Sequence, residues 1–208
     1  MKDEAIKKCM AIRGIPHRVL ILDIEATGLC PDSYPIEIAY ADPLESWVTS
    51  SLIQPHPNWE DLPWDEQAQT LTGIAPALLK NAIPATKVAK KVADDLSKAD
   101  LVLSDAPEWD NRWLNRLLDL NQTPIKIDIK DFRSTINHFN PLRQYLSTYK
   151  CLNIYDKSEH RAAGDVIRLL RVYRRAIHVP LFEEQYCPIK NRGFGAGERP
   201  AFIPGIPE

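Results

Sequence analysis

The feature that most constrains this chain is a nearly continuous apolar run, Arg18-Val-Leu-Ile-Leu-Asp-Ile-Glu25, which ends on two acids. A run without polar alternation is typical of a strand that is buried on both faces of a sheet. Ala26-Thr-Gly28 ends the run with turn-forming residues. Such a strand needs layers on both sides, so the run predicts a sheet with helices on both faces.

The remaining pattern predicts an alternation of strands and helices. Further strands are expected at 36–40, 46–53, Leu101–Leu103 and Ile125–Ile129. Helices are expected over Asp65–Thr72, 85–98, Glu108–Leu120, 132–149 and 160–178. Three sequential strands followed by strand–helix units predict an α/β fold with a mixed sheet flanked by helices.

At 208 residues the chain is long enough for one domain with a full core. We expect an N-terminal helical extension over 1–17, the main domain over 18–179 and a Pro/Gly-rich tail over 180–208. The tail carries Phe182, Tyr186, Phe194 and Phe202, and it could dock a protein partner.

Composition excludes several classes of protein. No apolar run reaches the ~18 residues that a membrane helix needs, and the charged N-terminus leads into no apolar signal segment. The four cysteines are far apart and form no CxxC pair, so we expect reduced thiols in a cytoplasmic protein that has no membrane contact. A net charge of −2 also disfavours a protein that coats long nucleic acid duplexes.

The two acids that end the first strand are candidate metal ligands. Side chains at positions i and i+2 of a strand point to the same face, so Asp23 and Glu25 emerge side by side. Two carboxylates in one partly buried place repel each other, which favours a cation between them, and their oxygen atoms suit Mg²⁺ or Mn²⁺. The alternative is that Asp23 bonds the turn amides near Thr27 and Gly28 while Glu25 is solvated.

Asp110 lies near the middle of the apolar stripe of the predicted helix Glu108–Leu120. A carboxylate on the core face needs a strong partner. The helix dipole also favours an acid in the first turn. That explanation accounts for the position of Asp110 but not for its inward direction, so a functional role is preferred.

His160-Arg-Ala-Ala-Gly-Asp165 precedes the apolar stripe of the last predicted helix. Asp165 lies at the edge of this stripe, within reach of the seam between helix and sheet. His160 does not share that face and is expected on the loop or the first turn. Taken alone, a half-exposed aspartate and a surface histidine are the simpler interpretation of the two residues.

The ordered set of these residues resembles the DEDD exonuclease superfamily, in its histidine-bearing branch, over roughly residues 18–178. The first motif is Ile21-Leu-Asp-Ile-Glu-Ala-Thr-Gly-Leu29, and Pro35-Ile-Glu-Ile-Ala39 is similar to the family's second strand. Leu71-Thr-Gly-Ile74 resembles the segment before the family's middle motif, and His160 and Asp165 match the third motif in spacing. The branch includes polymerase proofreading subunits, ribonuclease T and oligoribonuclease-like enzymes.

The middle motif departs from the family. The family has His-Asn-x-x-Phe-Asp, whereas this chain has Asp105-Ala-Pro-Glu-Trp-Asp110. The aspartate and an aromatic before it are kept, but Asp105 and Ala106 replace the His-Asn pair. Asp105 and Glu108 add negative charge near the site. The replacement of the His-Asn pair affects which side chains support the metal ligands and which substrates fit.

The resemblance implies a ribonuclease H-like fold, with a five-stranded mixed sheet, and a metal-dependent 3′→5′ exonuclease. Asp23, Glu25, Asp110 and Asp165 would hold two divalent cations, Mg²⁺ or Mn²⁺, and His160 would accept the proton of the attacking water. Thr27, Gly28, Leu29 and Trp109 would seat the terminal nucleotide, although a core role for Trp109 is the simpler one.

The implied substrate is the 3′ end of single-stranded DNA or RNA, with DNA favoured and nucleoside 5′-monophosphates as products. An exoribonuclease acting on RNA ends or short oligoribonucleotides is the alternative, since recognition of the 2′-hydroxyl decides such cases. A non-catalytic binding module on the same fold is a further alternative; its signature would be a missing ligand, and every ligand is present in this chain.

Overall fold

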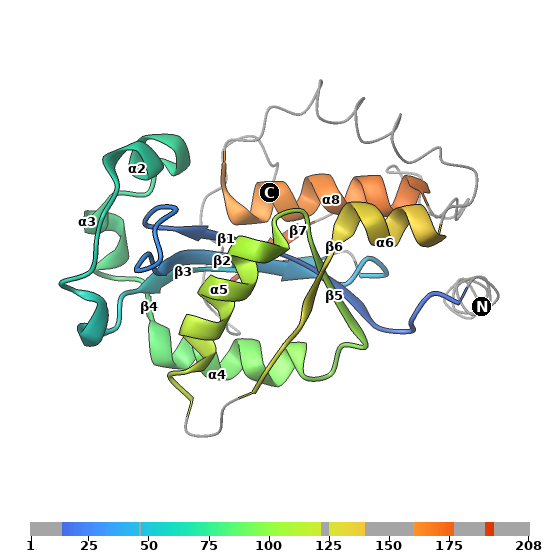
Figure 1. The fold of residues 1–208 in the computed structure, drawn as a ribbon, viewed down its shortest axis with the longest axis horizontal. Helices are drawn as coiled ribbons and strands as arrows, with labels where there is room; N and C mark the ends of the chain where they lie inside the picture. The colour runs from blue at the N-terminus through green and yellow to red at the C-terminus, as the bar shows by residue number, and fades with distance from the viewer. Residues whose placement is uncertain (1–13, 46, 122–124, 140–159, 177–189, 194–208) are drawn as a thin grey trace.

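The computed structural model describes residues 14–45, 47–121, 125–139, 160–176 and 190–193 (Figure 1). The strands are β1 (Val19–Ala26), β2 (Pro35–Ala41), β3 (Trp47–Gln54), β4 (Ile83–Pro84), β5 (Leu101–Ser104), β6 (Ile129–Asp131) and β7 (Lys190–Arg192). The helices are η1 (Pro57–Trp59), α2 (Glu66–Thr72), α3 (Pro76–Leu79), α4 (Ala85–Leu96), α5 (Pro107–Leu118), α6 (Phe132–Phe139) and α8 (Ala162–Ala176).

The sheet has the strand order β4-β3-β2-β1-β5-β6, and β7 pairs with β3. β1, β2 and β3 form an antiparallel meander, while β5 runs parallel to β1 and β6 parallel to β5. The predicted α/β fold with a mixed sheet is therefore confirmed. Its centre is the expected set of five strands, and the short strands β4 and β7 extend it at β3.

Helices cover both faces of the sheet, with α4 and α5 on one side and α6 and α8 on the other (Figure 1). β1 is central because its side chains alternate between the two resulting cores. Leu20, Leu22 and Ile24 belong to the core with α4 and α5, whereas Val19 and Ile21 belong to the core with α8. The apolar run thus serves both layers, as its lack of alternation predicts.

Two predicted elements differ from the structure. The expected strand Ile125–Ile129 is wrong in position, because pairing with β5 starts only at Ile129, opposite Val102. Ile125 and Ile127 pack against the core without joining the sheet, so their apolar character reflects burial and not strand pairing. In the tail, predicted as irregular, Lys190–Arg192 form β7 in parallel register with β3.

Other predictions fall partly outside the described residues. These are the N-terminal helix within 1–17, the second half of the helix 132–149, and most of the tail 180–208 with its aromatic residues. Within the part of the chain that the structure describes, no helix is long and apolar enough to cross a membrane.

Candidate active site

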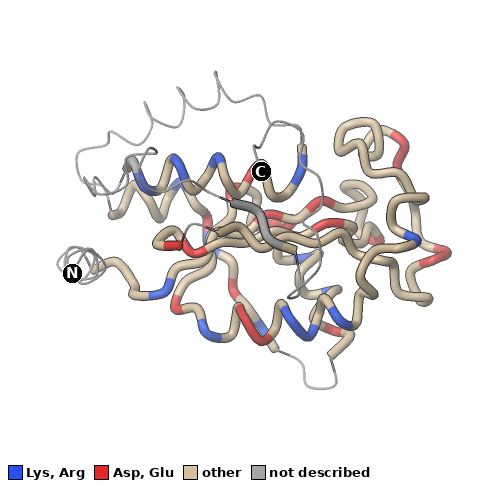
Figure 2. The backbone as a smooth tube through the Cα atoms, turned by 180° about the vertical axis from the view of Figure 1, so that it is seen from behind, with Lys and Arg blue, Asp and Glu red and all other residues tan. Residues whose placement is uncertain are grey.

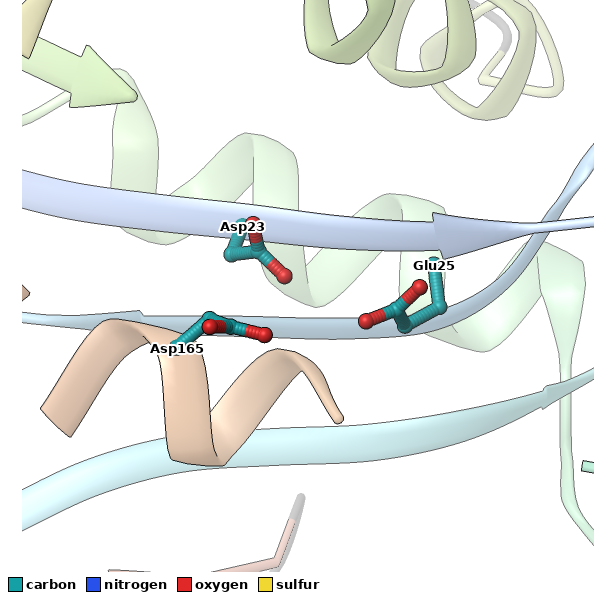
Figure 3. Close-up of side chains that lie close together, drawn as sticks. All are labelled: Asp23, Glu25 and Asp165. Carbon is teal, nitrogen blue, oxygen red and sulfur yellow. The ribbon is translucent and has the colours of Figure 1, made fainter. Parts of the chain in front are cut away.

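Three of the predicted acids meet between β1 and α8. Asp23 and Glu25 continue the face of β1 that carries Val19 and Ile21, and this face packs against α8. Asp165 lies in the first turn of α8 and points toward the same place (Figure 3). One carboxylate oxygen from each of the three acids lies within 4.8 Å of the others. The period-two pattern of the strand and the packing of α8 therefore create one acidic cluster from distant segments.

Asp110 approaches from the opposite layer. It lies on α5, is 1% exposed and is not one of the three acids of that cluster. The Ser104 hydroxyl and the backbone N–H of Ile24 donate to its carboxylate. The inward direction predicted from the helix stripe is confirmed. The charge of Asp110 also raises the pKa of Asp23, so the fourth acid lies close enough to repel the Asp23 carboxylate.

Burial and mutual repulsion disfavour ionisation of these carboxyls. The pKa of Asp23 is raised well above its usual value by burial, and then by the charges of Asp110 and Glu25. Burial raises the pKa of Glu25 to about 9, and the charges of Asp165 and Glu37 add to this effect. The pKa of Asp110 rises to about 8 through burial, against the opposing effect of the Ser104 hydrogen bond.

The chemistry of the donor set fits a hard divalent cation. Oxygen atoms of several carboxylates in one place are the ligands of Mg²⁺ and Mn²⁺, and burial together with nearby negative charge raises the pKa values of Asp23, Glu25 and Asp110. A cation between the carboxylates would favour their ionised forms, and its binding would release protons at neutral pH. The alternative reading, in which Asp23 serves the turn and Glu25 is solvated, does not explain the convergence with Asp165.

Arg168 lies between two acids at the edge of the cluster. Its guanidinium is 2.8 Å from a carboxylate oxygen of Asp165 and 3.3 Å from one of Asp105. Asp105 is thus paired with a cation on α8, whereas Glu108 is exposed. The departure from the His-Asn pair of the exonuclease motif is therefore accompanied by an ion pair that links the middle and third motifs.

His160 stands just before α8 and is exposed, as the sequence predicts. Its backbone has a φ of 48°, in the left-handed region that residues with a side chain rarely adopt. The next residue, Arg161, donates from Nε and from a terminal nitrogen to the carboxylate of Glu37, at 2.9 and 2.7 Å. The histidine therefore sits at a strained turn whose following residue is firmly held.

The loop after β1 is fixed at several points. The Thr27 hydroxyl accepts from the Tyr34 N–H at 3.2 Å, and the Thr27 carbonyl accepts from the Asp65 N–H at 2.8 Å. A Cβ at Gly28 would lie 3.0 Å from the Cβ of Asp65, so the close approach of α2's N-cap favours glycine. Leu29, in contrast, is 65% exposed and presents an apolar side chain on a rigid loop.

Trp109 is half-buried, next to Asp110 on α5. Its ring stacks on Trp113 with centroids 5.8 Å apart, and the Arg112 guanidinium lies 4.9 Å from its centre. Trp113 in turn donates to the Ser33 hydroxyl at 2.8 Å. These contacts tie α5 to the loop after β1, and Trp109 packs against the core of that layer.

Four residues that surround the clustered acids were not predicted from the sequence. Glu37 is 1% exposed in the middle of the apolar strand β2, and its partner Arg161 follows the predicted histidine. An acid centred in an apolar strand is the signal that could have indicated a buried partner. Ser104 and Arg168 gave no such signal, because a serine at a strand end and an arginine on a helix are ordinary.

Comparisons with solved structures identify the fold. Exonuclease I of E. coli in complex with a dA16 oligonucleotide has a TM-score of 0.57 and 14% identity, over 76% of this chain and 42% of that one. A 3′-exonuclease described in 3′-end specific recognition of histone mRNA stem-loop has a TM-score of 0.58 and 17% identity, over 100% and 89% of the two chains. A full-length 3′-exonuclease has a TM-score of 0.57 and 20% identity, over 92% and 93%.

The chain spans only 42% of the length of exonuclease I. No protein-family model and no curated protein sequence matches it. The structural likeness confirms the ribonuclease H-like α/β fold, which this chain shares with these exonucleases.

Proposed function

We propose that this chain is a metal-dependent 3′→5′ exonuclease that hydrolyses phosphodiester bonds at nucleic acid 3′ ends. The products are nucleoside 5′-monophosphates, and DNA is the favoured substrate. The observation that carries the proposal is the convergence of Asp23, Glu25 and Asp165 within 4.8 Å, with Asp110 close enough to raise the pKa of Asp23. Four acids from three elements are costly to bury together without a cation.

Asp23, Glu25, Asp110 and Asp165 would hold two divalent cations, Mg²⁺ or Mn²⁺. Such cations, when bound, activate a water molecule and stabilise the charge that develops on the phosphate. Asp23 and Glu25 are half-buried and not fully enclosed, which is compatible with the approach of a phosphate. The firm anchoring of Asp110 by Ser104 fixes the side of the site that faces α5.

His160 acts as the general base that takes a proton from the attacking water at an imidazole nitrogen. Its exposed position on the turn before α8 leaves the ring accessible to water. Imidazole is suited to this role because it gains and loses a proton near neutral pH.

Thr27, Gly28, Leu29 and Trp109 seat the terminal nucleotide. The exposed Leu29 offers an apolar surface for a base, and the Arg116 guanidinium holds its loop through the carbonyl of Asp32 at 2.8 Å. Figure 2 shows Lys and Arg positions in both helical layers and not gathered on one of them. This distribution suits an enzyme that grips a strand end more than one that coats a duplex.

An exoribonuclease that acts on RNA 3′ ends is the second candidate. Its support is the match to a 3′-exonuclease of nearly the same length, in which 100% of this chain and 89% of that chain are covered. The two candidates share all the site residues and differ in how the 2′-hydroxyl is recognised. A protein partner on the tail 180–208 is a third, separate prediction.

The test is digestion of matched 5′-labelled single-stranded DNA and RNA oligonucleotides with Mg²⁺ or Mn²⁺. The wild-type chain should shorten the labelled oligonucleotide from its 3′ end in steps of one nucleotide, and EDTA should abolish the reaction. The Asp23→Asn variant should be inactive. The matched control is Asp119→Asn, at the exposed C-cap of α5, which should keep wild-type rates.

The relative rates on DNA and RNA decide between the two substrates. Activity that survives EDTA, or that is unchanged in Asp23→Asn, would contradict the metal-dependent mechanism. Folded protein that binds Mn²⁺ and cleaves neither oligonucleotide would contradict the proposed function and favour a non-catalytic module.

A further inference from the structure

Glu37 holds the junction at which α8 begins. Its carboxylate accepts two hydrogen bonds from the Arg161 guanidinium and a third from the backbone N–H of Ala162 at 3.0 Å. Ala162 is the first residue of α8, so this last bond satisfies one of the N–H groups that a helix leaves without an internal acceptor. A side chain of β2 therefore caps the helix that carries the third motif.

The same junction connects the two functional residues of that motif. The N–H of Asp165 donates to the carbonyl of Arg161 at 3.0 Å, in the first hydrogen bond of the helix. His160 immediately precedes Arg161 and has a φ of 48°. A left-handed residue with a side chain persists only where the surrounding structure holds it. The contacts of Glu37 to Arg161 and Ala162 hold the chain directly after His160.

Glu37 is not itself part of the metal-binding set. It lies opposite Glu25 in the register of β1 and β2, yet it is not one of the three clustered acids. It is 1% exposed, and a bidentate pair with Arg161 compensates its charge. A buried carboxylate that is fully engaged by protein donors serves to fix geometry.

We infer that Glu37, through its bidentate pair with Arg161, is a positioning residue that keeps His160 in its strained conformation at the start of α8. The inference rests on the proposed function for the role of His160.

The experiment is a double-mutant cycle between Glu37→Gln and His160→Ala. The amide of the variant turns a donor toward the donors of Arg161, which breaks the bidentate pair. We expect kcat to fall about 10- to 100-fold with KM nearly unchanged, as for a misplaced catalytic group. In the His160→Ala background the same change should cost less than about 2-fold, because the group that Glu37 positions is absent. The variant should still bind Mn²⁺, as followed by electron paramagnetic resonance, although loss of the Glu37 charge opposite Glu25 changes the affinity.

Arg174→Lys is the matched control. Arg174 lies on the same helix and ties it to the carbonyls of Pro43 and Glu45, at 2.9 and 2.6 Å. A lysine there loses the planar fork of donors, as it does in Arg161→Lys, but at a position remote in sequence from His160. The control should lower thermal stability and leave kcat unchanged. Arg161→Lys replaces Glu37→Gln in the cycle if the latter fails to fold.

Histidine signals in NMR spectra give a readout that does not need activity. In protein labelled at the histidine rings, the His160 signal is identified by its absence in His160→Ala. It should shift or split in Glu37→Gln and stay in place in Arg174→Lys. Equal losses of kcat in both backgrounds, with an unmoved His160 signal, would overturn the inference. A wild-type chain without nuclease activity would contradict the proposed function alone, because the NMR result still tests the positioning.

Discussion

The pH dependence of stability in the metal-free protein tests the electrostatics of the acidic cluster most directly. Glu25 has a usual pKa of 4.5 and a raised pKa of about 9 in the folded chain. The stability associated with its protonated form is present below pH ~4.5 and is lost as the pH rises toward about 9. The metal-free protein should therefore become less stable with rising pH throughout the neutral range.

The magnitude follows from the linkage of protons to folding. Each proton that the folded chain binds and the unfolded chain does not contributes about 1.4 kcal/mol per pH unit. Between about pH 6 and about pH 7.5, Glu25 alone should lower the free energy of unfolding by about 2 kcal/mol. In a chain of this size, that loss corresponds to a fall in Tm of about 4–8 °C. Asp23 and Asp110 should add to the fall, since their pKa values are raised as well.

The assay is thermal unfolding after EDTA treatment, followed by circular dichroism across this pH range. The glutamine of Glu25→Gln cannot ionise, so the Tm of this variant should depend less on pH than that of the wild type. At the upper end of the pH range its Tm should be the higher of the two. Mg²⁺ favours the ionised carboxylates, so the gap in Tm between metal-bound and metal-free protein should widen with rising pH. Glu60→Gln, at an exposed position, is the control for loss of a carboxylate.

Two results would refute this reasoning. One is an equal pH dependence of Tm in the wild type and in Glu25→Gln. The other is a stabilisation by Mg²⁺ that does not change with pH.

Further predictions concern single residues of the site. Asp165→Asn should keep its fold by circular dichroism and lower kcat more than about 1,000-fold in the oligonucleotide assay; an active variant would contradict its role as ligand. His160→Ala should lower kcat about 10²- to 10⁴-fold, with partial recovery at higher pH where hydroxide is more abundant; a pH–rate profile identical to that of the wild type would argue against the general base. Arg168→Met leaves the buried Asp165 and the half-buried Asp105 without their shared cation, so the Tm of the metal-free variant should fall and Mg²⁺ should raise this Tm more than it does in the wild type. Gly28→Ala places a Cβ 3.0 Å from that of Asp65, so we expect a loss of about 1–3 kcal/mol in stability and a higher KM, measured by unfolding and by initial rates.

Much of the site could be predicted because its residues follow local rules. The pair Asp23 and Glu25 shares a face through the period of the strand, and the helix period turns Asp110 inward. His160 falls outside the apolar stripe of α8, as the structure confirms. These conclusions needed only the geometry of one element at a time.

Predictions were wrong or incomplete where a residue's state depends on a distant partner. The apolar residues before Ile129 read as a strand, but only from Ile129 onward does the chain lie beside β5. The short strand at Lys190–Arg192 exists because the edge of β3 offers hydrogen bonds to it. Neither the missing pairing of the first segment nor the pairing of the second is encoded in a local pattern.

The sequence by itself determined the central strand, the alternation of elements and the identities of the acids, because periodicity and residue chemistry act over short distances along the chain. The tertiary structure decided which acids converge. Asp165 joins Asp23 and Glu25 because α8 packs on their face of β1, while Asp110 comes from the layer on the other face. It also decided that Glu37 pairs with Arg161, 124 residues away in the chain. Burial leaves an acid no water to compensate its charge, so only the fold could supply the partner.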